Sequence, residues 1–179
     1  MSESIIVESS DSIPSRKAYV VLGLVILLAM CGAFFVQRSK GDLMPSSLMN
    51  EFMAIYFLLF GVSKLFDIKG FAAGFARYDL IAQKSIGYAY AYPFLELAIA
   101  VGYFQNSYYI NFLAAFVTLA GSIGVLRQLI QRNELICVCL GTKVKMPLGV
   151  VSLIEDLGMG AMASYMLVMM TEQSMTGMT

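Results

Sequence analysis

Two cysteines separated by one residue are the most reactive groups in the sequence. Cys137 and Cys139 form a C-x-C pair that is followed by Lys143 and Lys145. Neighbouring lysines favour the thiolate, which is the form that attacks disulfides and binds soft metals. A disulfide across one intervening residue is strained and therefore easily reduced. We expect a redox pair, with capture of a soft metal such as Zn or Cu(I), or two inert thiols, as the alternatives.

Histidine is absent from the chain, and this absence excludes several kinds of catalytic site. Without imidazole there is no Ser-His-Asp or Cys-His site, no histidine-ligated metal and no histidine-bound haem. Twelve Lys and Arg residues balance twelve Asp and Glu residues. The chain therefore lacks the basic field typical of proteins that bind nucleic acid, and no nucleic acid partner is expected.

Among the ionisable residues inside or at the ends of strongly apolar segments, five are candidates for a polar site within the membrane. They are Glu96, near the middle of one segment, Glu155 and Asp156, about two turns inside another, and Lys64 and Asp67, at the end of a third. A charged side chain near the centre of a bilayer costs about 2.5–3.5 kcal/mol, so such groups are usually paired, neutral or functional. We expect Lys64 to pair with Asp67 at i,i+3. The three remaining carboxylates are either polar contacts between helices or a proton or ligand site.

The segments that carry these groups are long enough to cross a membrane. Of 179 residues, 59% are hydrophobic and 13% are charged, and the mean hydropathy is +0.74. An ordinary soluble domain has about 25% charged residues, so that class is excluded. Five segments approach the roughly 20 residues that a transmembrane helix needs, namely 18–36, 48–66, 86–104, 109–130 and 148–170. We predict an all-α integral membrane protein, with a four-helix transmembrane bundle and one additional N-terminal transmembrane helix.

The chain divides into four parts by composition. Residues 1–17 form a polar tail, 18–36 a transmembrane signal anchor, 44–170 the four-helix membrane domain and 171–179 a second tail. The run that ends at Cys31 resembles a lipoprotein cleavage site, so a cleaved signal peptide is the alternative for the first span, although Met30 is large for such a site. Otherwise Cys31 is expected to pack as a small hydrophobic residue. Residues 67–85 mix apolar and charged residues at helical spacing, which predicts a helix lying at the membrane surface.

Basic residues indicate the orientation of the chain in the membrane. Short basic loops stay in the cytoplasm. With the N-terminus inside, ten of the twelve Lys and Arg residues are cytoplasmic, and only Arg38 and Lys40 lie outside. We therefore predict a multi-pass protein with a cytoplasmic N-terminus and an external C-terminus. The same rule places Cys137 and Cys139 on the cytoplasmic side. Gly141 and Pro147 break the helix and so place the pair in the loop just before the last span.

Small residues mark the predicted packing faces, because helices in lipid meet where backbones can approach closely. They recur on one face of the third, fourth and fifth spans, at Gly87, Ala91, Ala98 and Gly102, at Ala114, Thr118, Gly121 and Ser122, and at Ser152, Asp156, Gly160 and Ser164. Tyrosines near the span ends predict aromatic belts at the two membrane surfaces. Tyr88, Tyr90 and Tyr92 would form the inner belt, and Tyr103, Tyr108 and Tyr109 the outer one.

Several motifs, in order along the chain, resemble the MauE branch of the MauE/DoxX family of membrane proteins. They cover about residues 44–170 and comprise Gly61-x-x-Lys64-Leu65, Phe75-x-Arg77-Tyr78-Asp79, Pro93-x-x-Glu96, the block from Cys137 to Thr142, and Glu155-Asp156. The ordered set, with C-x-C before an acidic final span, is more specific than any single motif.

The resemblance implies a redox-associated protein of the bacterial inner membrane, with its C-terminus in the periplasm. MauE-like proteins are associated with methylamine utilisation and with maturation of the disulfide-rich small subunit of methylamine dehydrogenase, beside a thioredoxin-like partner. Some relatives carry a fused glutaredoxin-like domain, and since the chain shows none, its thioredoxin- or glutaredoxin-like partner is expected to be a separate protein. DoxX-like relatives are linked to quinone-coupled sulfur oxidation, so a quinone is a candidate cofactor, although none is evident from the residues.

The implied activity is that of a membrane thiol-disulfide oxidoreductase with Cys137 and Cys139 as its catalytic pair. An exported client and a cytoplasmic cysteine pair would lie on opposite sides of the membrane. Either the pair is reached from both sides, or a quinone acts as second carrier, or the pair exchanges only with a cytoplasmic thiol protein. A soft-metal binding or transport protein and a non-catalytic membrane chaperone or scaffold are the alternative functions.

Overall fold

Helices account for nearly all of the described structure. The computed structural model describes residues 16–41, 45–105, 108–131, 136–137, 146–147 and 150–176. In these ranges the chain forms, in order, α1 (Arg16–Lys40), α2 (Pro45–Leu65), α3 (Ile68–Phe75), α4 (Ile86–Phe104), α5 (Tyr108–Ile130), the strands β1 (Ile136–Cys137) and β2 (Met146–Pro147), and α6 (Val150–Thr176). The predicted all-α fold class is confirmed.

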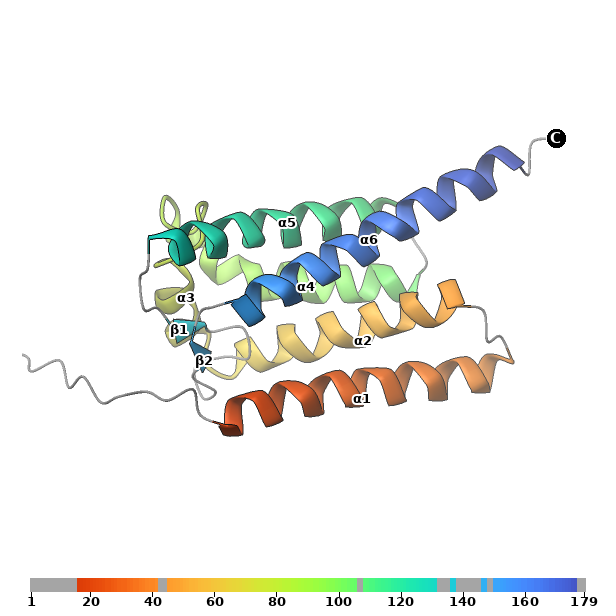
Figure 1. The fold of residues 1–179 in the computed structure, drawn as a ribbon, viewed down its shortest axis with the longest axis horizontal. Helices are drawn as coiled ribbons and strands as arrows, with labels where there is room; N and C mark the ends of the chain where they lie inside the picture. The colour runs from red at the N-terminus through yellow and green to blue at the C-terminus, as the bar shows by residue number, and fades with distance from the viewer. Residues whose placement is uncertain are drawn as a thin grey trace, which may run out of the picture.

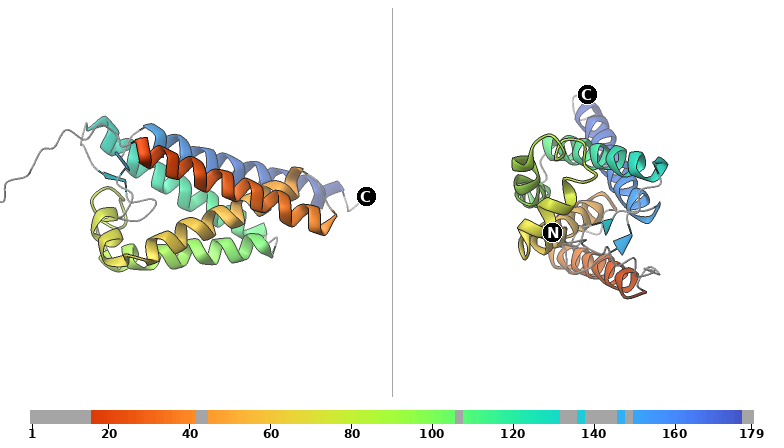
Figure 2. Two further views of the ribbon diagram at one scale, coloured as in Figure 1. Left: turned by 90° about the horizontal axis from the view of Figure 1, so that it is seen from below. Right: turned by 90° about the vertical axis from the view of Figure 1, so that its left-hand side faces the viewer.

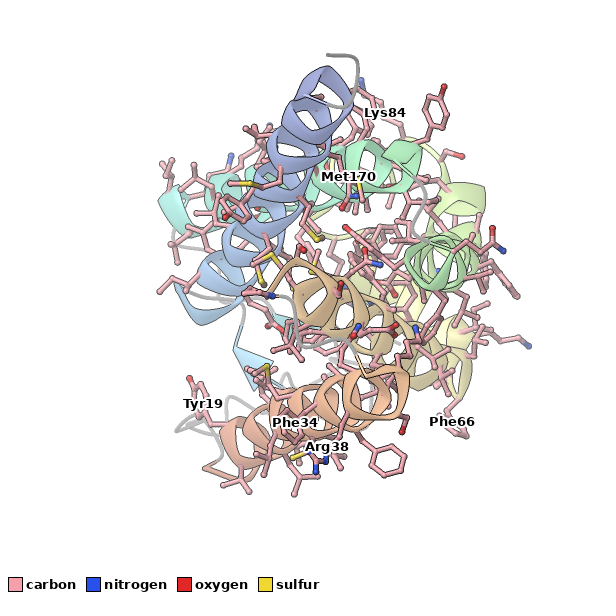
Figure 3. The ribbon with its side chains drawn as sticks, turned by 90° about the vertical axis from the view of Figure 1, so that its right-hand side faces the viewer. Tyr19, Phe34, Arg38, Phe66, Lys84 and Met170 are labelled. Carbon is pink, nitrogen blue, oxygen red and sulfur yellow. The ribbon has the colours of Figure 1, made fainter. Side chains whose placement is uncertain are left out.

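The long helices α1, α2, α4, α5 and α6 run lengthwise through the molecule, with α6 oblique to the others (Figure 1). The main contacts join α2 to α4, α5 to α6, and α1 to α2. The end-on view in Figure 2 shows α1 at one side of the group formed by the other helices. Its outer surface is apolar and exposed, and Figure 3 shows Tyr19 and Phe34 on it, and Phe66 just past the end of α2. Exposed apolar helices of this length are suited to contact with lipid.

Within the described ranges, four helices are long and apolar enough to cross a membrane: α1, α2, α5 and α6. The third predicted span also forms a helix, α4, which lies along α2. It carries Pro93 and Glu96 in its interior, and it is not one of these four. Helix α6 continues to Thr176, which is beyond the predicted end of the last span at residue 170.

One end of the bundle carries most of the basic residues. The C-terminal ends of α2 and α5, all of α3, the hairpin of β1 and β2, and the start of α6 gather there (Figure 1). Lys64 lies in the last turn of α2 and Arg127 in the last turn of α5, whereas Arg38 and Lys40 lie in the last turn of α1, at the opposite end. The described residues therefore have the unequal charge distribution on which the predicted orientation depends.

The segment 67–85 differs from the predicted surface helix. Asp67 begins α3 as its N-cap, because its side chain accepts a 3.0 Å hydrogen bond from the Gly70 N–H. The helix has only eight residues, and Phe71 and Phe75 are buried instead of lying at the surface. Turns follow up to residue 85, and they approach α5 so closely that a Cβ added to Gly124 would lie 2.9 Å from the Tyr78 carbonyl oxygen.

Small residues join α5 to α6, as predicted. Ala114, Thr118 and Ser122 are buried on α5. A Cβ added to Gly160 of α6 would lie 3.1 Å from Thr118 Oγ1, which shows how closely the two backbones approach. The predicted stripe on α4 is wrong for three of its four members, since Gly87, Ala91 and Ala98 are exposed and only Gly102 is buried.

Candidate functional site

A buried ion pair links α2 to α4. The Lys64 Nζ donates a hydrogen bond to Glu96 Oε1, and the two side chains are only 4% and 6% exposed. This partner differs from the predicted one, because Asp67 turns away to cap α3 while Lys64 faces the bundle. The pair is a polar contact between helices, which was one of the two interpretations of Glu96. It offsets the cost of burying two charges.

Aromatic rings surround the ammonium group of Lys64. Its Nζ lies 5.5 Å from the ring centroids of Phe60 and Phe71 and 5.2 Å from that of Tyr92. The ring of Phe75 packs against two of these rings. Its centroid lies 5.1 Å from that of Phe71 and 4.5 Å from that of Tyr92. Such ring faces attract a cation. The predicted belt position of Tyr92 is therefore wrong, because this side chain lies inside the bundle next to the ion pair.

The ion pair and its rings form one wall of a cavity of about 50 Å³. Helix α2, the segment from α3 to Tyr78, and helices α4, α5 and α6 all contribute to the lining, which comprises Tyr56, Phe57, Phe60, Lys64, Phe71, Phe75, Tyr78, Tyr92, Glu96, Thr118, Gly121, Val125, Glu155, Asp156 and Met159. The lining thus brings three carboxylates and one lysine to the same cavity, although they come from helices far apart in the sequence. Of the five predicted intramembrane ionisable residues, the fold brings four together and leaves Asp67 outside the lining.

Several polar atoms at the cavity have no hydrogen-bond partner among the described residues. They are Glu96 Oε2, Glu155 Oε1 and the hydroxyl of Tyr56. Small residues leave room for the acidic side chains, and a Cβ added to Gly121 would lie 3.7 Å from Asp156 Oδ2. Buried acceptors without a hydrogen-bond partner are rare in folded proteins, so a hydrogen-bond donor is expected at these atoms.

Sequence reasoning missed the aromatic members of the site, although a signal for them exists. Tyr56, Phe60 and Lys64 follow one another at intervals of four residues on α2, so they share one face of that helix. An aromatic stripe that ends in a lysine indicates a cation held against rings. The partner helix could not be read in the same way, because nothing local to Glu96 points to Lys64.

The cysteine pair is only partly within the described structure. Cys137 is the second residue of β1, which pairs antiparallel with β2 in the register Cys137 to Met146. Strand β1 lies against α3, the helix that supplies Phe71 and Phe75 to the cavity wall. Cys139 lies outside the described residues. Cys31 is exposed on α1 and so does not pack inside the bundle.

The cavity fits neither a quinone nor a metal centre. A cavity that binds a benzene ring has a volume of about 150 Å³, which is about three times the volume found here. The cavity is therefore too small for a quinone ring. Within the described ranges, no group of three or more His, Cys, Asp or Glu side chains is arranged to hold a metal ion.

Comparison with known proteins gives one match. The sequence model of a family described as methylamine utilisation protein MauE matches residues 22–169. The match begins inside α1, so it includes most of the helix that we predicted as an addition to the four-helix domain. No curated protein and no solved structure matches the chain.

Proposed function

Because the chain belongs to the methylamine utilisation protein MauE family, and is thus a multi-pass membrane protein linked to methylamine utilisation, we propose that it exchanges thiol and disulfide equivalents through Cys137 and Cys139. Its client would be an exported, disulfide-rich protein such as the small subunit of methylamine dehydrogenase. A separate thioredoxin- or glutaredoxin-like protein would be its redox partner. The bacterial inner membrane is the proposed location.

One observation carries this proposal beyond the family. Cys137 lies in a short hairpin that rests on α3, at the end of the bundle where the basic residues gather. Strand pairing with Met146 therefore fixes the position of the Cys137 backbone. Lys143 and Lys145 follow closely in sequence, and positive charge near a thiol favours the reactive thiolate.

The proposed exchange balances in two steps. The Cys137 thiolate attacks a disulfide sulfur of the partner, which forms a mixed disulfide and releases one partner thiolate. The Cys139 thiolate then attacks the Cys137 sulfur, which forms the Cys137–Cys139 disulfide and releases the second partner thiolate. The pair loses two electrons and the partner gains them. Oxidation of a client dithiol is the same sequence in reverse, with the pair reduced and a disulfide formed in the client.

Trapping of the mixed disulfide tests the proposal. A Cys139→Ser variant cannot complete the second step, so a covalent adduct at Cys137 should accumulate in cells and be released by reductant. Cys137→Ser should trap nothing, and Cys31→Ser, which changes the exposed cysteine of α1, should behave as wild type. Thiols that stay reduced under every oxidant, with no adduct in Cys139→Ser, would contradict thiol exchange.

A further inference from the structure

We propose that the cavity between α2, α4, α5 and α6 binds a small primary ammonium cation, of the size of ammonium or methylammonium. The cation would lie between the Lys64–Glu96 pair and the carboxylates of Glu155 and Asp156. This site contains neither cysteine of the C-x-C pair. The proposal therefore goes beyond thiol exchange, and each of the two can fail without the other.

The charges around the cavity favour a cation. Glu96, Glu155 and Asp156 line it together with one lysine. Lys64 is bound to Glu96, so these two charges cancel. The two acids of α6 then remain without a basic residue of the lining. An ionised carboxylate within a membrane is costly unless a positive charge accompanies it.

The unmatched atoms at the cavity are hydrogen-bond acceptors, which favours an ammonium group. Glu96 Oε2 and Glu155 Oε1 have no donor within the described part of the chain, and the Tyr56 hydroxyl can also accept. The Glu96 side chain is only 6% exposed, so bulk water does not satisfy its free oxygen. A primary ammonium carries three N–H donors, whereas a proton added to one carboxyl supplies a single O–H. An ammonium ion bound in the cavity therefore brings more donors to these acceptors than one added proton does.

The walls suit an organic ammonium ion better than a metal ion. Aromatic rings make up much of the lining, and ring faces attract ammonium groups. Lys64 already shows this environment, since its own ammonium lies within 5.5 Å of three ring centroids and bonds to a carboxylate. Divalent metal ions of the magnesium and calcium type need about six or more oxygen ligands around one point, and in the described ranges no three His, Cys, Asp or Glu side chains are arranged to hold a metal ion.

The volume limits the cation to a few heavy atoms. About 50 Å³ is about a third of the cavity that accepts a benzene ring. Ammonium and methylammonium are small enough, and tetramethylammonium is both bulkier and without N–H donors. We therefore expect selectivity for small ammonium ions that can donate hydrogen bonds.

Equilibrium dialysis with radiolabelled methylammonium tests the site. The full chain is placed in lipid nanodiscs, and we expect saturable binding of one ion per protein. Unlabelled ammonium should compete, whereas sodium and tetramethylammonium should not. Glu155→Gln and Asp156→Asn should each weaken binding roughly tenfold or more, because each removes a charge-assisted hydrogen bond.

A matched variant separates the cavity from general charge effects. Glu51 is also a buried carboxylate, but it pairs with Lys40 near the start of α2 and does not line the cavity. Glu51→Gln should keep the wild-type affinity. If the α6 variants do not fold, Tyr56→Phe decides, because it keeps the ring and removes only the hydroxyl, and binding should weaken.

Three results would overturn the proposal. The first is the absence of saturable binding to folded wild-type protein. Infrared bands of protonated carboxyl groups that disappear in Glu155→Gln and Asp156→Asn would then show that protons neutralise the cavity. The second is equal competition by sodium. The third is an affinity that none of the cavity variants changes. Trapping of a mixed disulfide at Cys137 does not bear on any of these results.

Discussion

Lys64 and Glu96 illustrate how single residues decide the chemistry of this protein. Each is almost fully buried, and each is the other's hydrogen-bond partner. In such a pair the loss of one member is worse than the loss of both, because a lone buried charge has nothing to offset its desolvation. The cost of one substitution therefore depends on what is left behind.

Removal of the lysine alone should destabilise the protein strongly. Lys64→Met keeps much of the side-chain volume but leaves Glu96 unpaired, and we expect a loss of about 3–5 kcal/mol of unfolding free energy. The double variant Lys64→Met with Glu96→Leu should recover most of this loss. Unfolding in mixed detergent micelles measures both. Lys84→Met is the control, since Lys84 is exposed in the turn before α4 (Figure 3) and its change should have little effect. A double variant no more stable than Lys64→Met would contradict the pairing argument.

Asp79, in the turn between α3 and α4, should make stability depend on pH. Burial raises the pKa of its carboxyl group, although hydrogen bonds from the Ala82 and Ile81 N–H groups oppose the shift. The folded state then holds the proton more tightly than the unfolded state. The contribution of Asp79 to stability is therefore greatest in acid and declines as the pH rises through the ordinary Asp range and the raised value.

An Asp79→Asn variant tests this sign. The amide oxygen can still accept both hydrogen bonds, and the side chain no longer ionises. Thermal unfolding from acid to neutral pH should show a smaller decline for the variant than for wild type. A steeper decline in the variant would show that the carboxylate stabilises the fold in its ionised form.

The sequence was sufficient to predict which ionisable residues are important. It was not sufficient to predict which of them form pairs. The free-energy cost of placing a charged side chain in a membrane singled out four residues, namely Lys64, Glu96, Glu155 and Asp156. The partner of Lys64 could not be predicted, because Asp67 is close in sequence while Glu96 is on another helix. Hydrogen bonding at the start of α3 gives Asp67 a different role. Local spacing has no information about such a competition.

At the scale of helices, α5 and α6 pack through their small residues, whereas much of the small-residue stripe of α4 is exposed. Both stripes have the same periodicity. In lipid, a face turned outward can be as apolar as one turned inward, so a pattern shows that a stripe exists but not which way it points. Helix existence and approximate bounds were predictable for all five long segments, because each needs a run of apolar residues.

The α5–α6 contact should be sensitive to side-chain size at Gly160. A Cβ there would lie 3.1 Å from Thr118 Oγ1 and 3.2 Å from Leu119 Cδ2. Gly160→Leu should therefore cost about 1–3 kcal/mol through overpacking. Gly158→Leu is the matched control on the same helix, since nothing lies within 4 Å of its added Cβ. The two variants can be compared by unfolding in detergent, and equal stability would show that α5 and α6 separate more easily than their contact suggests.

At the scale of the whole molecule, the gathering of basic residues at one end predicts a single orientation in the membrane. Lys64, Lys69, Arg77, Lys84 and Arg127 all lie in the segments that form this end. Basic segments remain in the cytoplasm. The opposite end, where α6 finishes at Thr176 (Figure 1), should then face outward.

A reporter fused after the C-terminus checks this orientation. Alkaline phosphatase, which is active only outside the cytoplasm, should be active in the fusion, and a cytoplasmic fluorescent protein in its place should be dark. Exchange of Arg38 for Gln should leave the result unchanged, because it makes the outer end still less basic. A fluorescent C-terminus would reverse the orientation and place the cysteine hairpin outside.

The depth of the acidic residues along α6 has an electrical consequence. Glu155 lies five residues after Val150, the first residue of α6, which is about 8 Å along the helix axis. The hydrocarbon layer is about 30 Å thick, so an ion that enters from this end crosses roughly a quarter of it. A full crossing is worth about 2.3 kcal/mol per 100 mV. Occupancy of the cavity should therefore respond only weakly to the membrane potential and follow mainly the ion concentration on the basic side.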